Sequence, residues 1–171
     1  LLLAELALEQ NRQGRDVLAY WEMLCRQFGH FRTALAPVVM TGIQGKQNMT
    51  RMLDSLRKTP PATIGGLAVT SWEDFRDERG RLGPIKGATD AAARNFLLYR
   101  LGDSGRIALR PSGTEPKAKA YIEVASPPRA PGMTDADWHA LGEQTDALMR
   151  RLTNDFLRLA LERVGLEPEP K

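Results

Sequence analysis

From Arg110 to Lys117 the chain reads Arg-Pro-Ser-Gly-Thr-Glu-Pro-Lys, a short polar segment between two stretches with the pattern of strands. Arg110 offers a planar guanidinium group that can bond two phosphate oxygens at once. The hydroxyl groups of Ser112 and Thr114 can donate to further oxygens, and Gly113 lets backbone N–H groups turn toward an anion. The two prolines restrict the segment, so less conformational entropy is lost on binding. These residues predict a phosphate-binding loop.

The other residues of this loop have less definite roles. Gly113 could serve through its N–H group or only through the turn geometry that glycine permits. Glu115 carries the wrong charge to contact a phosphate, so we expect it to form a cap or a salt bridge within the loop. Lys117 is a further candidate for the site because it could add positive charge nearby. It could equally be an ordinary lysine on the surface of a strand.

The segments that flank the loop predict a small antiparallel sheet. Lys117 to Val124 alternates polar and apolar residues, which is typical of a half-buried strand. Upstream, Phe96–Leu101 and Arg106–Arg110 predict a hairpin around the turn Gly102–Gly105. Three sequential strands with short connections indicate a meander in which the polar loop joins the last two strands. A turn at the rim of a sheet is open to a ligand.

This loop and strand resemble the final domain of the α-D-phosphohexomutases, whose signature loop R-P-S-G-T-E-P-K matches at all eight positions. The order of the other expected elements extends the resemblance over nearly the whole chain. The resemblance implies an α+β fold, with a small, mainly antiparallel sheet and helices packed on one face, similar to the TATA-box-binding-protein-like fold. It also implies that Arg110, Ser112, Gly113 and Thr114 hold the phosphate that is not being transferred.

The family's other signature loops have no counterpart in this sequence. These are a phosphoserine loop like T-A-S-H-N-P, a metal loop like D-G-D-x-D-R and a sugar loop like G-E-x-S-G. Because the chain also begins at Leu1 without a methionine, we expect it to be the C-terminal piece of a longer enzyme. We expect no catalytic residue and no metal ligand in this piece, and no turnover by it alone. The resemblance implies that Mg²⁺ and a bisphosphate sugar activator serve the parent enzyme.

The residues leave the identity of the sugar phosphate open. The segment Trp21–Phe28 and the turn Gly42–Gly45 resemble the phosphoglucomutase and phosphopentomutase branch, so interconversion of glucose 1-phosphate and glucose 6-phosphate is our first choice. A phosphomannomutase, a phosphopentomutase or a phosphoglucosamine mutase are the alternatives. A hypothesis of another class is a stand-alone anion-binding or interaction module without catalysis, because small sheets backed by helices also serve in binding proteins.

The N-terminal region predicts two helices. The first, Leu1–Gln13, should end at Gly14, and the second should be capped by Asp16 and closed by Gly29. The second helix should bury one apolar face, which consists of Val17, Leu18, Trp21, Leu24, Cys25 and Phe28. We interpret residues 1–29 as the last helix of a preceding domain plus a linker helix. The first helix exposes leucines, so the missing N-terminal domains or a second copy of the chain are expected partners.

Residues 30–165 then form the expected phosphate-binding domain, and residues 166–171 a tail. Before the meander we expect an extended segment, a helix, a strand and a charged connecting loop, at Phe31–Thr41, Gly45–Lys58, Gly66–Trp72 and Glu73–Thr89. The helix should end at Thr59-Pro60-Pro61 because proline cannot continue it. Thr134 and Asp137 predict a capping box at the start of a last helix that covers one side of a sheet of three or four strands.

The composition excludes several classes of protein. Lys and Arg number 24 against 21 for Asp and Glu, and the charges are interspersed, so we expect no nucleic-acid surface. No apolar run approaches the roughly 18 residues of a membrane span, and no signal peptide is recognisable. The single cysteine, Cys25, predicts core packing, and a cytoplasmic location is expected. His30 and His139 lack neighbours at metal-ligand spacing and predict surface or packing roles.

Overall fold

The computed structural model describes residues 1–40, 44–113, 115 and 117–167. Its helices are α1 (Leu2–Arg12), α2 (Val17–Phe28), α3 (Gly45–Lys58), α4 (Ala88–Ala93) and α5 (Asp135–Glu162). Its strands are β1 (Phe31–Val39), β2 (Thr63–Ile64), β3 (Leu67–Ala68), β4 (Ser71–Asp74), β5 (Leu97–Arg100), β6 (Gly105–Pro111) and β7 (Lys117–Ala125). The predicted α+β class is confirmed.

The main sheet has five strands in the order β1-β7-β6-β5-β4, and every neighbouring pair is antiparallel. The predicted meander of β5, β6 and β7 is confirmed, but the prediction of three or four strands is wrong. The sheet gains β1 at one edge and β4 at the other. β1 pairs with β7 along its whole length, from Phe31 opposite Ala125 to Val39 opposite Lys117. A further small sheet is formed by β2 and β3.

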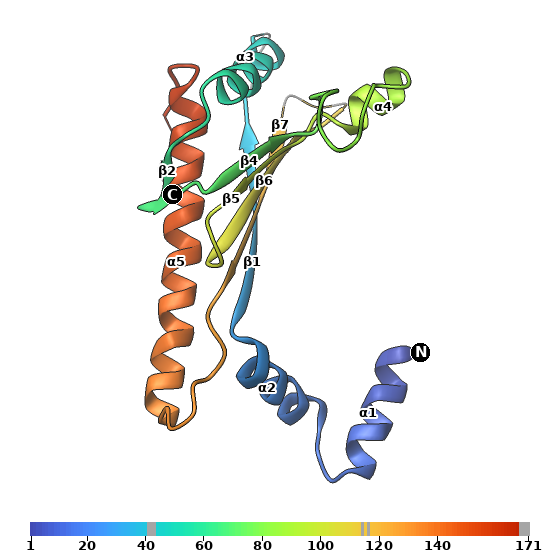
Figure 1. Ribbon diagram of the computed structural model, residues 1–171, viewed down its shortest axis with the longest axis vertical. Coiled ribbons are helices and arrows are strands. Elements are labelled where there is room, and N and C mark those ends of the chain that lie inside the picture. Colours follow the sequence, from blue (N-terminus) through green and yellow to red (C-terminus); the bar gives the residue numbers. More distant parts are fainter. Residues whose placement is uncertain (41–43, 114, 116, 168–171) are drawn as a thin grey trace.

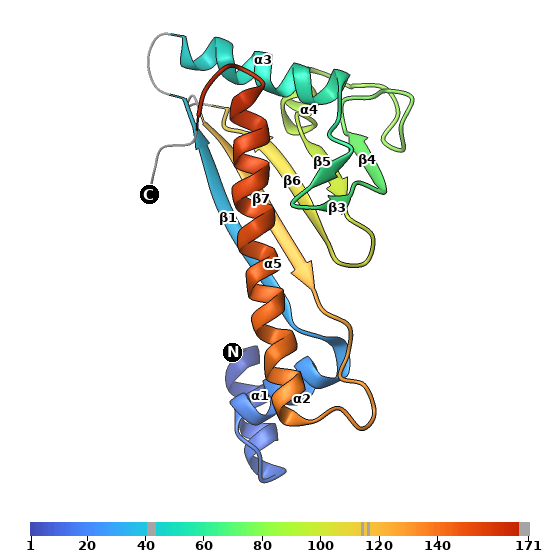
Figure 2. The same cartoon turned by 90° about the vertical axis from the view of Figure 1, so that its left-hand side faces the viewer.

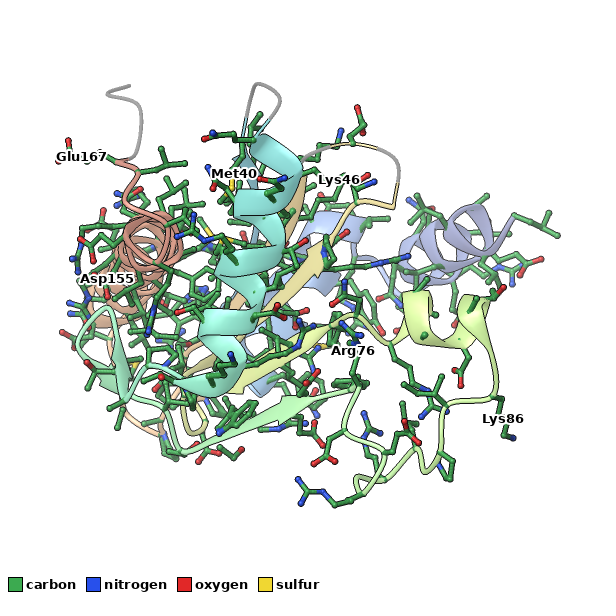
Figure 3. All side chains as sticks on the ribbon, turned by 90° about the horizontal axis from the view of Figure 1, so that it is seen from above. Met40, Lys46, Arg76, Lys86, Asp155 and Glu167 are labelled. Carbon is green, nitrogen blue, oxygen red and sulfur yellow. The ribbon has the colours of Figure 1, made fainter. Side chains whose placement is uncertain are left out.

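One face of the main sheet is covered by helices, and the other is largely open (Figures 1 and 2). The long helix α5 runs along β1 and β7, and α3 lies across one end of the sheet, where it contacts α5 and β7. Figure 3 views this end, with Met40 after β1 and Lys46 in the first turn of α3. The largest fully buried side chains include Met52, Leu56, Ile64, Leu97, Tyr99, Ile107, Leu109, Ile122, Leu152 and Phe156.

The predicted ends of the helices are confirmed where the structure describes them. Asp16 caps α2 by accepting a hydrogen bond from the N–H of Ala19 at 2.7 Å. Thr134 caps α5 by accepting a bond from the N–H of Asp137 at 3.1 Å, and its hydroxyl donates to the Asp137 carboxylate at 2.7 Å. Helix α3 stops at Lys58, ahead of the two prolines. Part of the predicted turn Gly42–Gly45 lies outside the described residues.

The expected strand Gly66–Trp72 and the expected loop Glu73–Thr89 need correction. The strand is divided into β3 and β4 because the chain changes partners: Val69 N–H donates to Ala62 O, whereas Thr70 N–H donates to Arg100 O. The loop begins only after Asp74, because the last residues of β4 pair with β5. Its end overlaps the short helix α4, which the sequence analysis missed.

The first two helices project beyond the sheet at the end opposite α3 (Figures 1 and 2). The leucines of α1 are exposed as predicted, with Leu2 82% and Leu3 68% accessible. The prediction that α2 buries its apolar face is wrong within the described residues, since Trp21 is 51% and Phe28 is 55% exposed. The helix lies past the end of the sheet, where little covers it. The division into domains stays a prediction.

Two expectations about single residues are confirmed. Cys25 is buried, and this burial raises the pKa of its thiol, as expected of a packing residue. His30 is buried against Trp138, so it has a packing role, and His139 is exposed. In the described part of the chain, no helix is both long and apolar enough to span a membrane.

Candidate phosphate-binding site

The predicted loop lies at the rim of the sheet, between the end of β6 and the start of β7. Hydrogen bonds within it hold its two ends together. Ser112 N–H donates to Lys117 O at 2.7 Å, and Lys117 N–H donates to Glu115 O at 2.8 Å. The Ser112 hydroxyl accepts a further bond from Glu115 N–H at 3.3 Å. These bonds hold the described residues of the loop at the sheet rim. Thr114 lies outside the described residues.

Arg110 is the last cation before this turn, and it lies on the open face of the sheet. Its neighbours Ile107 and Leu109 are fully buried on the covered face, and alternation along β6 sends Arg110 to the other side. Across the ladder Arg110 pairs in register with Lys119 of β7. Neither cation has an ion-pair partner among the described residues. The two charges on adjacent strands therefore remain available to an anion.

Lys117 and Glu115 form a salt bridge within the loop, with 2.6 Å between Lys117 Nζ and Glu115 Oε2. This contact confirms the salt bridge expected of Glu115. It also offsets the charge of Lys117, which the sequence had left as a candidate for the site. Lys119 is thus the better second cation. The sequence predicted Lys119 only as a polar residue of a strand, because its pairing with Arg110 depends on a register that the local pattern does not reveal.

Gly113 occupies an open position in the turn. A Cβ atom added there would meet no atom within 4 Å, and its φ angle lies outside the left-handed region that favours glycine. Glycine is therefore not required at this position by the geometry of the turn. The structure leaves open space where a side chain would project, and the role of the Gly113 N–H group in binding an anion stays a prediction.

The loop and the strands below it border a depression of about 250 Å³. Its lining consists of Arg110, Pro111, Ser112, Gly113, Glu115, Lys117, Lys119 and Tyr121. All but the last two belong to the predicted loop. Lys119 and Tyr121 were missed as site residues, although their alternation with buried alanines on β7 placed them on one face. A depression that combines two uncompensated cations, a hydroxyl and an accessible backbone is chemically suited to an anion.

The fold and the site define an α+β domain with an anion-suited loop at the rim of its sheet. Residues 74–135 match the family model described as the phosphoglucomutase/phosphomannomutase C-terminal domain. This segment, which contains β5, β6, the loop and β7, therefore carries the C-terminal domain of that family, and the resemblance inferred from the sequence is confirmed.

Individual relatives agree with this assignment. A phosphoglucomutase of Staphylococcus aureus is 30% identical over 127 residues, which cover 74% of this chain and 23% of the relative. The enzyme of another strain is 30% identical over 124 residues, or 72% of this chain and 22% of the relative. The chain thus spans about a quarter of the length of the curated relatives it matches.

A solved structure was also found, the open form of pp63/parafusin, a phosphoglucomutase from Paramecium. The match covers 80% of this chain and 24% of the Paramecium chain, with 16% sequence identity and a TM-score of 0.34.

Proposed function

We propose that this chain is the C-terminal part of a phosphohexomutase and that its loop holds the phosphate of the substrate that is not being transferred. Phosphoglucomutase, which interconverts glucose 1-phosphate and glucose 6-phosphate through a bisphosphate, is the first choice among the members. The observation that carries this proposal is the pair of uncompensated cations, Arg110 and Lys119, beside the intact signature loop. The identity to phosphoglucomutases supports the choice of sugar.

The site would contribute to catalysis from a distance. A phosphate held by Arg110, Lys119 and the Ser112 hydroxyl lies away from the reacting end of the sugar. The binding energy of such a remote group can position the reacting end, and in this way raises the rate of the chemical step. Charge-assisted hydrogen bonds contribute roughly 1.5–3 kcal/mol against about 0.5–1.5 kcal/mol for neutral ones, so Arg110 should dominate.

We propose that the transfer chemistry belongs to other domains of the parent enzyme. In the part of the chain that the structure describes, no group of three or more His, Cys, Asp or Glu side chains could hold a metal ion. On the family resemblance, we assign Mg²⁺, the phosphorylated serine and the bisphosphate activator to the rest of the parent enzyme. The preceding domains are also the proposed partners of the exposed helices α1 and α2. A cytoplasmic location stays a prediction.

The proposal is tested by Arg110→Ala in the full-length enzyme. The specificity constant kcat/KM for glucose 1-phosphate should fall by roughly ten- to a hundredfold or more, because charge-assisted bonds are removed. Phosphorylation of the enzyme by saturating bisphosphate should persist, because the loop contacts the unreactive phosphate.

Arg106→Ala is the matched control for this experiment. Arg106 lies on the same strand and the same face, but it is engaged by Glu123 at 2.6 Å. Its removal should leave kcat/KM within about twofold, as for most surface substitutions. If Arg110→Ala abolishes the phosphoenzyme while sugar-phosphate affinity stays normal, the loop belongs to the transfer site and the assignment is wrong.

A further inference from the structure

Tyr121 lies in the same depression as the two cations, at its sheet end. It follows Lys119 by two residues on β7 and therefore lies on the same face, about 7 Å farther along the strand. Tyr121 is 38% exposed. Its cross-strand partners are Ala108 on β6 and Leu35 on β1. Ala108 has a small side chain, and Leu35, which is 56% exposed, extends the apolar surface.

The depression therefore has two chemically different ends. The loop end carries positive charge and hydroxyl groups, and the sheet end carries an aromatic ring. In the described part of the chain, the phenol hydroxyl of Tyr121 has no hydrogen-bond partner. Tyrosine combines an apolar ring with a polar tip, and pockets typically pair such apolar surface with a few polar groups that fix orientation.

We propose that Tyr121 contacts the sugar of the bound sugar phosphate and so positions it relative to Arg110. Its ring packs against the C–H surface of the sugar, and its hydroxyl forms a hydrogen bond with a sugar hydroxyl. The spacing of about 7 Å between Lys119 and Tyr121 along the strand is comparable to the reach from a phosphate through its ester oxygen onto a sugar ring. This inference rests on the proposed function, since it needs the phosphate to be held at the loop.

The test compares two probes, inorganic phosphate and glucose 6-phosphate, in NMR titrations of the 171-residue chain. The wild-type chain should bind glucose 6-phosphate more tightly than inorganic phosphate. Tyr121→Ala should remove this preference, with a loss of about two- to tenfold for glucose 6-phosphate and no change for inorganic phosphate. Tyr121→Phe should lose only the part of the preference for glucose 6-phosphate that depends on the hydroxyl group. Arg110→Ala should weaken the binding of both probes.

Tyr20→Ala, on α2 and away from the sheet, controls for the general effect of removing a tyrosine. If the wild-type chain binds inorganic phosphate but shows no preference for glucose 6-phosphate, the role of Tyr121 is overturned and the proposed function stands. Equal weakening of both probes in Tyr121→Ala also overturns it. If neither probe binds to the wild-type chain, the loop assignment itself fails and this inference fails with it.

Discussion

Strand β7 contributes to both faces of the sheet, and the two faces differ in almost every property. On the covered face its residues are small or aliphatic and almost fully buried under α5: Ala118, Ala120, Ile122 and Val124. On the open face they are charged or aromatic: Lys117, Lys119, Tyr121 and Glu123. The same strand thus holds the fold on one side and carries the candidate site on the other. Stability and binding should therefore respond to different substitutions on a single strand.

The largest effect is expected on the covered face. Ile122 is fully buried between the sheet and its helices, so Ile122→Ala should lower the free energy of unfolding by about 2–5 kcal/mol through lost burial and a residual cavity. Leu35→Ala is the matched control, because Leu35 lies on the open face of the neighbouring strand. It should cost at most about 0.5 kcal/mol. Urea denaturation measures both. Similar losses would mean that the open face is as well packed as the covered one.

The sequence correctly predicted the regions whose structure is determined by residues that lie close together in the sequence. The β5–β7 meander, its polar loop and the Thr134 cap depend on alternation, turn residues and a capping box within a few positions. The pairing of β1 with β7 joins residues 78 to 94 positions apart, from Val39 opposite Lys117 to Phe31 opposite Ala125, and no local pattern specifies it. The division of residues 66–72 into two strands likewise depends on a change of distant partners, from Ala62 to Arg100.

In the candidate site, too, contacts between side chains could not be predicted from local sequence patterns. The signature loop was evident in the sequence, yet the choice between Lys117 and Lys119 as the second cation was not. It depends on whether Glu115 reaches Lys117 and on which residue faces Arg110 across the ladder. The exposed face of α2 was mispredicted for a related reason, since an apolar stripe shows that a helix can be buried but not that a partner is present.

A smaller effect is expected from the loop itself. Ser112→Ala should weaken the binding of inorganic phosphate by about two- to tenfold, because one neutral hydrogen bond contributes less than a charge-assisted one. The unfolding free energy should change little, because Ser112 lies in an exposed loop and its hydroxyl accepts a long bond, 3.3 Å, from Glu115 N–H. NMR titration of the Ser112→Ala preparation measures the effect on binding, and urea denaturation of the same preparation measures the effect on stability. Ser71→Ala, an exposed hydroxyl on the far edge strand β4, is the control.

If Ser112→Ala lowers stability as much as it lowers affinity, the hydroxyl group shapes the loop rather than binding the anion. The two faces would then differ less in their roles, because a residue of the open, binding face would mainly stabilise the fold.

The stability contributed by the packing of His30, which lies between α2 and β1, should depend on pH. His30 stacks on Trp138 of α5 with 3.9 Å between ring centroids, and its Nε2 lies 3.2 Å from Trp138 O. Its Nδ1 is buried without a hydrogen-bond partner in the described part of the chain. Burial lowers the pKa of His30 below 6.5, and Arg32 and His139 act in the same direction, against the Trp138 carbonyl and Asp146. The folded state therefore favours the neutral ring.

The sign of the pH dependence follows from this lowered pKa. As the pH falls below 6.5, the unfolded chain gains a proton at His30 before the folded chain does, so stability is lost on acidification. The change in unfolding free energy with pH that is due to this one group can reach at most about 1.4 kcal/mol per pH unit. Urea denaturation at pH 7.5 and 5.5 should show a smaller decrease in His30→Gln than in the wild-type chain. His139→Gln, an exposed histidine on α5, should keep most of the decrease, because burial is the main cause of the lowered pKa of His30. An equal decrease in all three would place the acid sensitivity elsewhere and leave the His30 junction as packing alone.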